Sequence, residues 1–405
     1  MAEPFSEFIT IDAIADVKGG KRLPKGMVVQ DQETSHPYLR VVDFNNDGLD
    51  RSNVRYINDD AYARVKRYTI TDEDVYISIA GTIGRVGVIP KDLSGANLTE
   101  NAAKITNINS EINKIFLMYY LRSHLGQSDI ASKVVGTSQP KLALFRIQKL
   151  KIPKVPLPTQ RKIATILSAY DDLIENNLRR IKILEEMAQN LYREWFVKFR
   201  FPGHQHARFT DSPLGRIPEG WEVVKVGEIL KKVKRGTKIQ KKDYATEGLI
   251  PIVDQGKEFI GGYTDNTDSL ISDDLPLIVF GDHTRVLKFI DFPFACGADG
   301  TQLLKSNDGR MPMTLFYYAL SSIDLSDFAY ARHFKFLKEE LLVLPAKSIA
   351  DLFDRFVAPL REQTRSLMQK NISLRRTRDL LLPRLISGEV DVSALDITVP
   401  EEASA

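Results

Sequence analysis

The sequence predicts an α+β fold, in which two mixed α/β domains are joined by two long antiparallel coiled-coil helices in a pseudo-twofold internal repeat. Three observations support this prediction. Short motifs recur in the same order in both halves of the chain, whose 405 residues suffice for two or three domains. A heptad-patterned segment, "IENNLRRIKILEEMAQNLYREWF" (174–196), separates the halves. Both halves are otherwise rich in glycine, proline and short apolar runs, which is typical of strands and turns.

The clearest repeat is a strand that leads into a glycine turn. The segment "DVYISIAGTIGRV" (74–86) aligns with "DLPLIVFGDHTRV" (274–286) at a constant offset of 200 positions. Four residues are identical: Asp74, Gly81, Arg85 and Val86 recur as Asp274, Gly281, Arg285 and Val286. Further along, "IFLMYYL" (115–121) is similar to "TLFYYAL" (314–320), and both predict a buried helix.

This order of motifs predicts the domain layout. Each half contains a basic loop, strands with glycine turns, a helix, a proline and a long helix. The connection between the halves is rich in Pro, Gly and His, as linkers are, and the last residues have nothing to bury. The expected layout is a first domain (1–155), a central helical spacer (156–200), a linker (201–220), a second domain (221–345), a distal helical spacer (346–392) and a disordered tail (393–405).

Heptad spacing continues along both helical spacers. In the central spacer one row contains Ile163, Tyr170, Asn177, Leu184 and Leu191, and the other contains Leu167, Ile174, Ile181, Ala188 and Trp195. An offset of 186 transfers these rows to the distal spacer as Ile349, Phe356, Gln363, Lys370 and Thr377, and as Phe353, Leu360, Leu367, Leu374 and Leu381. About 35 helical residues span about 50 Å, which is comparable to a DNA turn of about 34–36 Å. Such a pair of helices would suit a reader of two separated half-sites.

A polar residue lies near the middle of one row in each helix, Asn177 in the first and Gln363 in the second. If the helices pack antiparallel around this layer, the two amides meet and fix the register at some cost in stability. The alternative is that both amides face water. Pro359 departs from the pattern, because it must kink the second helix or begin a new one, which would leave Ile349 to Phe356 as a separate short helix.

The composition excludes several classes of protein. Hydrophobic residues make up 43% and charged residues 27%, as in ordinary soluble proteins. No apolar run approaches the about 18 residues that span a bilayer, and the first residues are acidic where a signal peptide is basic. We therefore expect a cytoplasmic protein with no membrane association. Cys296 is the only cysteine and the six histidines are scattered, so neither a disulfide framework nor a metal site is predicted.

Four long segments resemble a known family. They are "GTSQPKLALFRIQKLKIPKVPLP" (136–158), "PLPTQRKIATILSAYDDLIENNLRRIKILEEMAQNLYREWFVKFRFPG" (156–203), "DSPLGRIPEGWEV" (211–223) and "LRRTRDLLLPRLISGEVDV" (374–392). They are similar to the specificity subunits of type I restriction-modification systems. The resemblance implies that two target recognition domains each read one half of a split site in double-stranded DNA. It also implies that the helices are a spacer and a docking surface for two modification (methyltransferase) subunits, which restriction (translocase-nuclease) subunits join.

Catalytic motifs are missing, which agrees with a noncatalytic subunit. An amino-methyltransferase needs Asn/Asp-Pro-Pro-Tyr/Phe, and the nearest string, "DFPF" (291–294), lacks the second proline. The string "FACGADG" has the wrong spacing for Phe-x-Gly-x-Gly, and no Gly-x-x-x-x-Gly-Lys-Ser/Thr phosphate loop occurs. No cofactor is therefore expected in this chain. The resemblance places S-adenosylmethionine, ATP and Mg on the partner subunits.

Candidate DNA contacts are cations and hydrogen-bonding side chains on the predicted loops. In the first domain they are Lys21, Arg22, Lys25, Arg85, Thr137, Ser138, Gln139 and Lys141. In the second they are Lys234, Arg235, Lys238, Lys241, Lys242, Gln255, Lys257, His283, Thr284, Arg285, Arg332, His333 and Lys335. The stretch "KKVKRGTKIQKK" (231–242) suits phosphates better than bases, while Arg85 and Arg285 either contact DNA or support the fold. Because "GTSQPK" and "YARHFK" occupy equivalent places but differ, the two half-sites should differ.

Two other interpretations remain open from the sequence. The chain could serve as the specificity subunit of another multisubunit methyltransferase-nuclease, which the neighbouring coding sequences would reveal. It could instead be a coiled-coil scaffold that reads no DNA, and salt-sensitive binding to duplex DNA would count against that.

Overall fold

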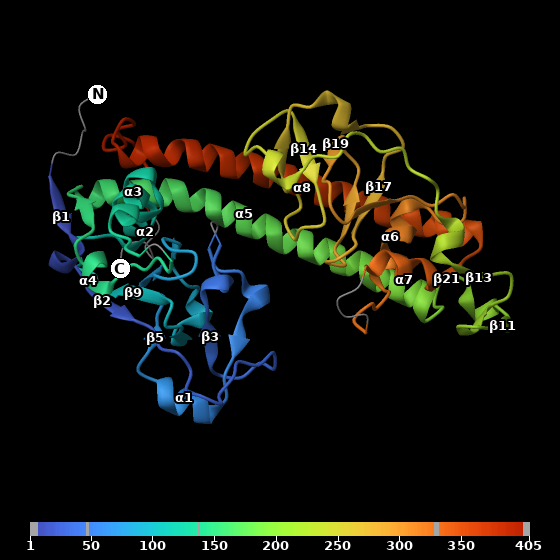
Figure 1. Ribbon diagram of the computed structural model, residues 1–405, viewed down its shortest axis with the longest axis horizontal. Coiled ribbons are helices and arrows are strands. Elements are labelled where there is room, and N and C mark those ends of the chain that lie inside the picture. Colours follow the sequence, from blue (N-terminus) through green and yellow to red (C-terminus); the bar gives the residue numbers. More distant parts are fainter. Residues whose placement is uncertain (1–6, 46–47, 137, 328–331, 400–405) are drawn as a thin grey trace. The chain divides into compact units, whose positions relative to one another are not determined.

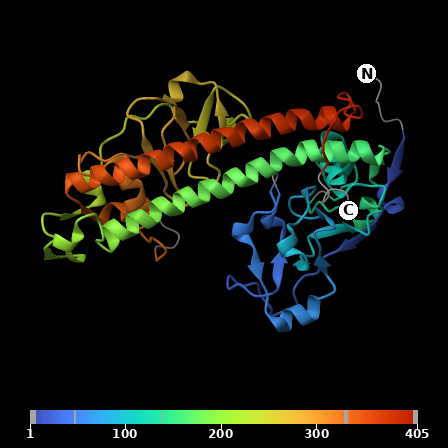
Figure 2. The same cartoon turned by 180° about the vertical axis from the view of Figure 1, so that it is seen from behind.

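The computed structural model describes residues 7–45, 48–136, 138–327 and 332–399, and Figures 1 and 2 show it from opposite sides. By its internal contacts the chain forms two units. Unit 1 contains Met1–Asn177 and Gln369–Ala405, and unit 2 contains Leu178–Met368. Each unit has a β-rich domain and a part of both long helices, α5 (Leu157–Tyr192) and α8 (Lys347–Ile386). The predicted α+β class with two long packed helices is confirmed.

The domain of unit 1 has a short strand pair, β1-β10, and two four-stranded sheets in the orders β4-β3-β8-β5 and β2-β9-β6-β7. Its strands are β1 (Phe8–Thr10), β2 (Asp16–Gly19), β3 (Pro37–Leu39), β4 (Arg55–Tyr56), β5 (Thr69–Ile70), β6 (Val75–Ser78), β7 (Val86–Gly87), β8 (Ala96–Leu98), β9 (Ala102–Thr106) and β10 (Lys151–Pro153). Its short helices are α1 (Asp59–Val65), α2 (Lys114–Arg122), α3 (His124–Ser132) and α4 (Leu144–Ile147).

The domain of unit 2 contains sheets in the orders β15-β14-β19-β16 and β18-β17-β20, together with the pairs β13-β21 and β11-β12. Its strands are β11 (Phe209–Ser212), β12 (Gly215–Pro218), β13 (Glu222–Lys225), β14 (Ile250–Val253), β15 (Gly262–Thr264), β16 (Leu270–Ile271), β17 (Leu277–Gly281), β18 (Leu287–Ile290), β19 (Phe294–Cys296), β20 (Thr301–Leu304) and β21 (Leu341–Leu344). Its short helices are α6 (Met313–Ser321) and α7 (His333–Glu339).

The strand pairings of unit 1 recur in unit 2. Each unit has one four-stranded sheet with both parallel and antiparallel pairs, β4-β3-β8-β5 in unit 1 and β15-β14-β19-β16 in unit 2. In each of these sheets the two central strands are parallel, and each central strand pairs with an antiparallel edge strand. The strand before the repeated glycine turn is central in both other sheets, β6 between β7 and β9, and β17 between β18 and β20. The repeat in the sequence is therefore a repeat of topology.

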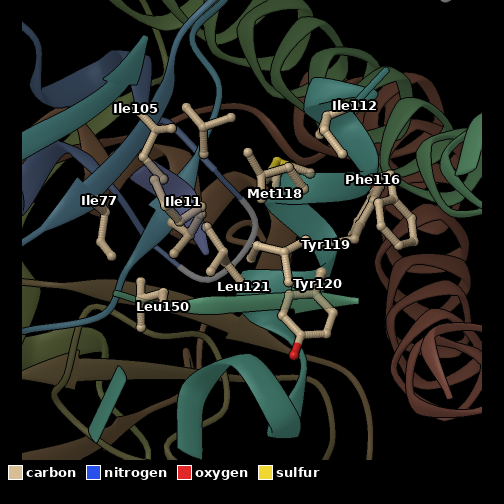
Figure 3. Close-up of a cluster of buried hydrophobic side chains, with 14 of the residues drawn as sticks. Ile11, Ile77, Ile105, Ile112, Phe116, Met118, Tyr119, Tyr120, Leu121 and Leu150 are labelled. Atoms are coloured by element: carbon tan, nitrogen blue, oxygen red, sulfur yellow. The ribbon is translucent and has the colours of Figure 1, made fainter. Parts of the chain in front are cut away.

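The core of unit 1 forms around α2. The side chain of Asn113 caps this helix by accepting hydrogen bonds from the backbone N–H groups of Ile115 and Phe116. All residues from Phe116 to Leu121 are buried, as expected for a helix that is apolar on every face. Figure 3 shows several of these side chains meeting Ile11, Ile77 and Ile105 from the strand side. Residues of α5 and α8 complete the same cluster, including Leu167 and Leu385.

In unit 1 the long helices run antiparallel and share polar contacts. Arg378 on α8 forms an ion pair with Asp171 on α5, and further along α5 the Asn177 Nδ2 atom donates to Asn371 Oδ1 at 2.8 Å. The hydroxyl of Tyr119 on α2 donates to the other oxygen of Asp171. Burial raises the pKa of Tyr119, and the negative charge of Asp171 raises this pKa further, so the phenol remains a donor.

The same arrangement occurs in unit 2 with different residues. The Arg361 guanidinium on α8 lies 3.6 Å from the carboxylate of Glu185 on α5, and it stacks on the rings of Phe289 and Tyr317 at 4.7 and 5.1 Å. Burial raises the pKa of Glu185, although the Arg361 charge opposes this shift. In each unit, an arginine of α8 thus pairs with a carboxylate of α5 next to an aromatic side chain of the β-rich domain.

The predicted pairing of Asn177 with Gln363 is wrong. Asn177 pairs with Asn371, while Gln363 is exposed. The inward row of α8 contains Ala350, Val357, Thr364, Asn371 and Arg378, each one position after the row that the offset of 186 gave. A shift of one residue turns a helix position by about 100° and moves it to the solvent side. Of the two outcomes expected at Pro359, the start of a new helix is wrong, because α8 passes through this position as one helix.

The remaining predicted interface residues lie on the inner side of the helices. Phe353 and Leu367 are buried on α8, and Leu360, Leu374 and Leu381 are half-buried there. On α5, Ile163, Leu167 and Ile174 are buried, while Tyr170, Ile181, Leu184 and Leu191 are half-buried. Trp195 is buried just beyond α5, in a π-helical turn (Arg193–Val197).

The beginning of the predicted disordered tail has defined contacts. Val392, the last residue before this tail, is buried in the core cluster of unit 1. The Lys162 ammonium of α5 donates to the carbonyl oxygens of Ser393 and Leu395 at 2.7 and 2.8 Å. The chain therefore stays attached to α5 at least to Leu395, and residues 400–405 lie outside the described part.

We expect Phe353→Ala to destabilise unit 2 by about 3–5 kcal/mol, because it opens a cavity in a full core. Phe353 is 0% exposed, and its ring lies 5.1 Å from that of Phe196 and 6.0 Å from that of Trp195. Denaturant unfolding followed by tryptophan fluorescence measures this, since Trp195 and Trp221 are the only tryptophans and both belong to this cluster.

The matched control for this experiment is Phe356→Ala. Phe356 lies on the same helix but is 55% exposed, so its removal should cost less than about 1 kcal/mol. Equal losses in the two variants would contradict the proposed position of the core.

Candidate nucleic-acid interface

Three loops meet around the repeated glycine turn in unit 1. The Arg85 guanidinium donates to the carbonyl oxygen of Phe44, which joins the turn to the loop after β3. The backbone of Leu142 donates to the carbonyl of Ile79 at 3.0 Å, which joins the turn to the loop before α4. We name residues 40–45, 79–85 and 138–142 the unit 1 loop cluster.

Equivalent loops meet in unit 2. The Thr284 hydroxyl donates to the carbonyl oxygen of Gln255 at 2.6 Å, and the His283 backbone N–H donates to the Gln255 side-chain oxygen at 3.1 Å. On the other side of the turn, the backbone N–H of His333 donates to the carbonyl of Asp282, and that of Phe334 donates to the Asp282 carboxylate, both at 2.8 Å. Residues 254–258, 281–285 and 332–335 form the unit 2 loop cluster.

Lys288 and Gly300 support the first loop of the unit 2 loop cluster. The Lys288 ammonium is almost fully buried and donates to the carbonyl oxygens of Asp254 and Glu258, which closes the first loop. Burial lowers the pKa of Lys288, while the nearby Asp254 carboxylate opposes this shift. The Gln255 carboxamide packs on Gly300, whose φ is +62°, and a Cβ there would lie 2.6 Å from the amide atoms. Glycine is thus favoured at position 300.

The basic stretch 231–242 lies on the surface of unit 2. Two of its cations have partners, since Lys231 pairs with Asp274 at 2.9 Å and Arg235 donates to the Gln302 side chain at 2.8 Å. The other predicted phosphate contacts are exposed and have no hydrogen-bond or ion-pair partner among the described residues: Lys234, Lys238, Lys241 and Lys242. A hollow of about 590 Å³, lined by residues 230–235 with Leu303 and Phe334, adjoins this stretch.

Some of the predicted cations of unit 1 already have partners within the chain. Arg22 is engaged with Glu100 at 2.5 Å, and the Lys21 ammonium lies over the Tyr68 ring at 5.9 Å. Lys25 is exposed, and the described residues offer it no ionic partner.

Sequence reasoning did not consider three further basic residues of unit 1. Arg64, Lys66 and Arg67 are exposed at the end of α1 and directly precede Tyr68. The string "ARVKRY" (63–68) was the available signal, because it places three cations within four positions next to an aromatic residue.

Other predicted contacts fall into two groups. Arg85 and His333 are internal supports: the Arg85 guanidinium is bound to backbone carbonyls, and His333 is 5% exposed with its ring Nδ1 against Asp282. Arg285 is exposed but donates to the Leu325 carbonyl at 3.0 Å. Among the described residues, no hydrogen-bond or ion-pair partner is found for the exposed side chains of Ser138, Gln139, Lys141, Lys257, His283, Arg332 and Lys335, although the Lys335 ammonium lies over the Phe336 ring at 6.0 Å. Thr137 lies outside the described residues.

Within the described ranges, no group of three or more His, Cys, Asp or Glu side chains is placed to hold a metal ion. None of the helices in that part of the chain combines the length and the apolar character needed to cross a membrane.

Comparisons with known proteins show similarity to one family. Residues 6–186 match the family model described as "Type I restriction modification DNA specificity domain". The specificity subunit of the MjaIX type I restriction enzyme of Methanocaldococcus jannaschii is 27% identical over 301 residues, which are 69% of each chain. The MjaVIII specificity subunit of the same organism is 30% identical over 225 residues, 54% of this chain and 47% of that protein.

A solved structure shares the fold. The crystal structure of the S subunit of a type I restriction-modification system from M. genitalium superimposes with a TM-score of 0.54 at 18% identity. The match covers 95% of this chain and 97% of that one. Taken with the sequence relatives, these findings show that the chain is similar, in sequence and in fold, to the type I restriction-modification DNA specificity subunits.

Proposed function

We propose that this chain reads a bipartite, asymmetric site in double-stranded DNA and directs adenine methylation and cleavage by its partner subunits. One observation carries this proposal. The same three-loop cluster is built in both units, but the exposed side chains on the two clusters differ. Like scaffolds with unlike side chains suit a target with two unlike halves, since a palindromic target requires two like readers.

The basic stretch of unit 2 supports the DNA partner. Lys234, Lys238, Lys241 and Lys242 have no carboxylate that neutralises them within the described part of the chain. Free surface cations of this kind bind phosphates, release counterions and give affinity without sequence preference. The loop clusters would then supply the sequence preference.

Apolar residues on the outside of the long helices support docking of two modification subunits. On α5, Leu173, Ile183 and Met187 are 51%, 55% and 52% exposed, and on α8, Ile372 and Leu380 are 44% and 62% exposed. Large apolar side chains left in water on an otherwise charged helix favour a partner surface. In the proposed complex the modification subunits hold S-adenosylmethionine, and the restriction subunits hold ATP and Mg.

The central test is to express this chain with its neighbouring modification subunit in a methylation-free host and to map modified adenines across the genome. A split motif with two different halves, seen only when this chain is present, is the expected result. Absence of methylation by an intact and bound modification subunit would instead favour a scaffold that reads no DNA.

Replacing Lys238 by Ala should weaken binding of the complex to all duplexes about equally and reduce the slope of log K against log salt by about 0.9. Binding titrations from low to moderate salt, on specific and unrelated duplexes, measure this. Lys225→Ala is the control, because Lys225 is also exposed but is already paired with Glu339 at 2.7 Å. A loss confined to the specific duplex would show that Lys238 contacts a base.

Replacing Ile183 and Met187 together by Glu should prevent copurification with the modification subunit, because charges would enter an apolar contact. Both side chains are about half exposed, so the free energy of unfolding of the isolated chain should change little. Leu249→Glu is the control, since Leu249 is 84% exposed on a loop. Unchanged copurification of the double variant would exclude this face of α5 from docking.

A further inference from the structure

The two loop clusters expose side chains of different chemistry. In unit 1, Val42 is 66% exposed after β3, and the neutral residues Thr82, Ser138 and Gln139 are exposed on the other two loops. At the equivalent places in unit 2, Lys257 follows β14 and His283 occupies the glycine turn, while Arg332 precedes α7 and Lys335 lies in its first turn, all exposed. The first cluster therefore offers methyl groups and an amide beside one cation, Lys141, and the second offers mostly cationic donors beside one carboxylate, Glu258.

Both arginines of the unit 1 loop cluster are paired internally. Arg40 forms an ion pair with Asp43, whose side chain is fully buried, and the Arg85 guanidinium is bound to the carbonyl of Phe44. Lys141 remains exposed, at the base of the third loop, where its backbone pairs with that of Val135. The guanidinium groups of this cluster are thus used to shape its loops and are not presented to a ligand.

The unit 2 loop cluster uses neutral groups for the same task. Its loops are tied by the Gln255 carboxamide, the Thr284 hydroxyl and the backbone of His333. This leaves the side chains of Lys257, Arg332 and Lys335 without ion-pair partners among the described residues. Asp299 is exposed beside Gly300, on which Gln255 packs.

Base pairs in the major groove differ in the groups that they present. Guanine offers the acceptors N7 and O6, which Arg and Lys bind, and its partner cytosine offers an N4 donor, which a carboxylate accepts. Thymine offers a methyl group to apolar side chains, and adenine pairs its N6 and N7 with a Gln or Asn amide. Most exposed groups of the unit 2 loop cluster are of the kind that binds G·C pairs. Most exposed groups of the unit 1 loop cluster are of the kind that binds A·T pairs.

We propose, on the basis of the function proposed above, that the unit 2 loop cluster specifies G·C base pairs through Arg332 and Lys335, and that the unit 1 loop cluster specifies A·T base pairs through Val42 and Gln139. The two halves of the target then differ in base composition as well as in sequence. Gln255 is a positioning residue in this scheme, because it fixes the glycine turn beside the third loop.

The test uses the complex of this chain with its modification subunit and duplexes that carry the mapped motif or single base-pair changes in it. Arg332→Ala or Lys335→Ala should lower the preference for the native G·C pair by about tenfold or more at one position of one half-site. Gln139→Ala should do the same at an A·T pair in the other half. Competition binding measures both effects and requires no methylation by the variants.

Arg208→Ala is the matched control, because Arg208 is exposed in unit 2 but paired with Glu219 at 2.9 Å, and it should leave all preferences unchanged. The inference is overturned if neither Arg332→Ala nor Lys335→Ala alters a G·C preference, or if these variants relax an A·T position. Failure of the proposed function looks different, because the wild-type complex would then show no split motif at all. Thermal unfolding of each variant separates lost contacts from lost folding.

Discussion

The antiparallel pairing of α5 with α8 is the constraint on which both domains depend. Neither domain has a closed core without both helices: Leu167 and Leu385 complete the cluster around α2 in unit 1, and Ala188 and Phe353 complete the cluster of unit 2. Burial of these side chains provides most of the stabilisation, since hydrophobic burial is the dominant favourable term in folding. Sliding one helix along the other would open both cores at once.

Polar contacts give this pairing its register. The ion pairs Asp171–Arg378 and Glu185–Arg361 each bury an arginine that must keep its partner, and the Asn177–Asn371 hydrogen bond lies between them on α5. Such groups add little net stability, because removing charges from water costs about as much as the pair returns. Their effect is selective, since a slipped register would leave the buried Arg378 without its partner, at a cost of about 3–5 kcal/mol. The cost is smaller for Glu185–Arg361, because the Glu185 side chain is 48% exposed.

The sequence predicted the fold class because its strongest signals are long. Hydrophobic spacing that continues over five heptads and motifs that repeat in the same order cannot be produced by local propensity alone. The row of α8 was misassigned because the match of Ile163-Ala164 with Ile349-Ala350 does not say which residue of each pair faces inward. In α5 both are buried, whereas in α8 only Ala350 is fully buried.

The site was predicted less completely, because exposure of a loop side chain depends on contacts with distant loops. His333 and Lys335 are two positions apart in one basic string, yet the first is held under Asp282 and the second faces solvent. The loop after β3 was not considered because it has no basic run. Its equivalence to the Gln255 loop follows only from the parallel pairings of β3 with β8 and of β14 with β19, each of which joins two pairs of residues.

The order of the units along the chain has a consequence for biosynthesis. Unit 2 is one uninterrupted segment, whereas unit 1 combines the first part of the chain with residues after Gln369, including Leu385, Ile386 and Val392 in its core. A ribosome therefore releases every residue of the second domain before it has supplied those that close the first. Until these residues are synthesised, the apolar face of the amino-terminal domain stays uncovered. The domain that is translated first is therefore the last to be completed.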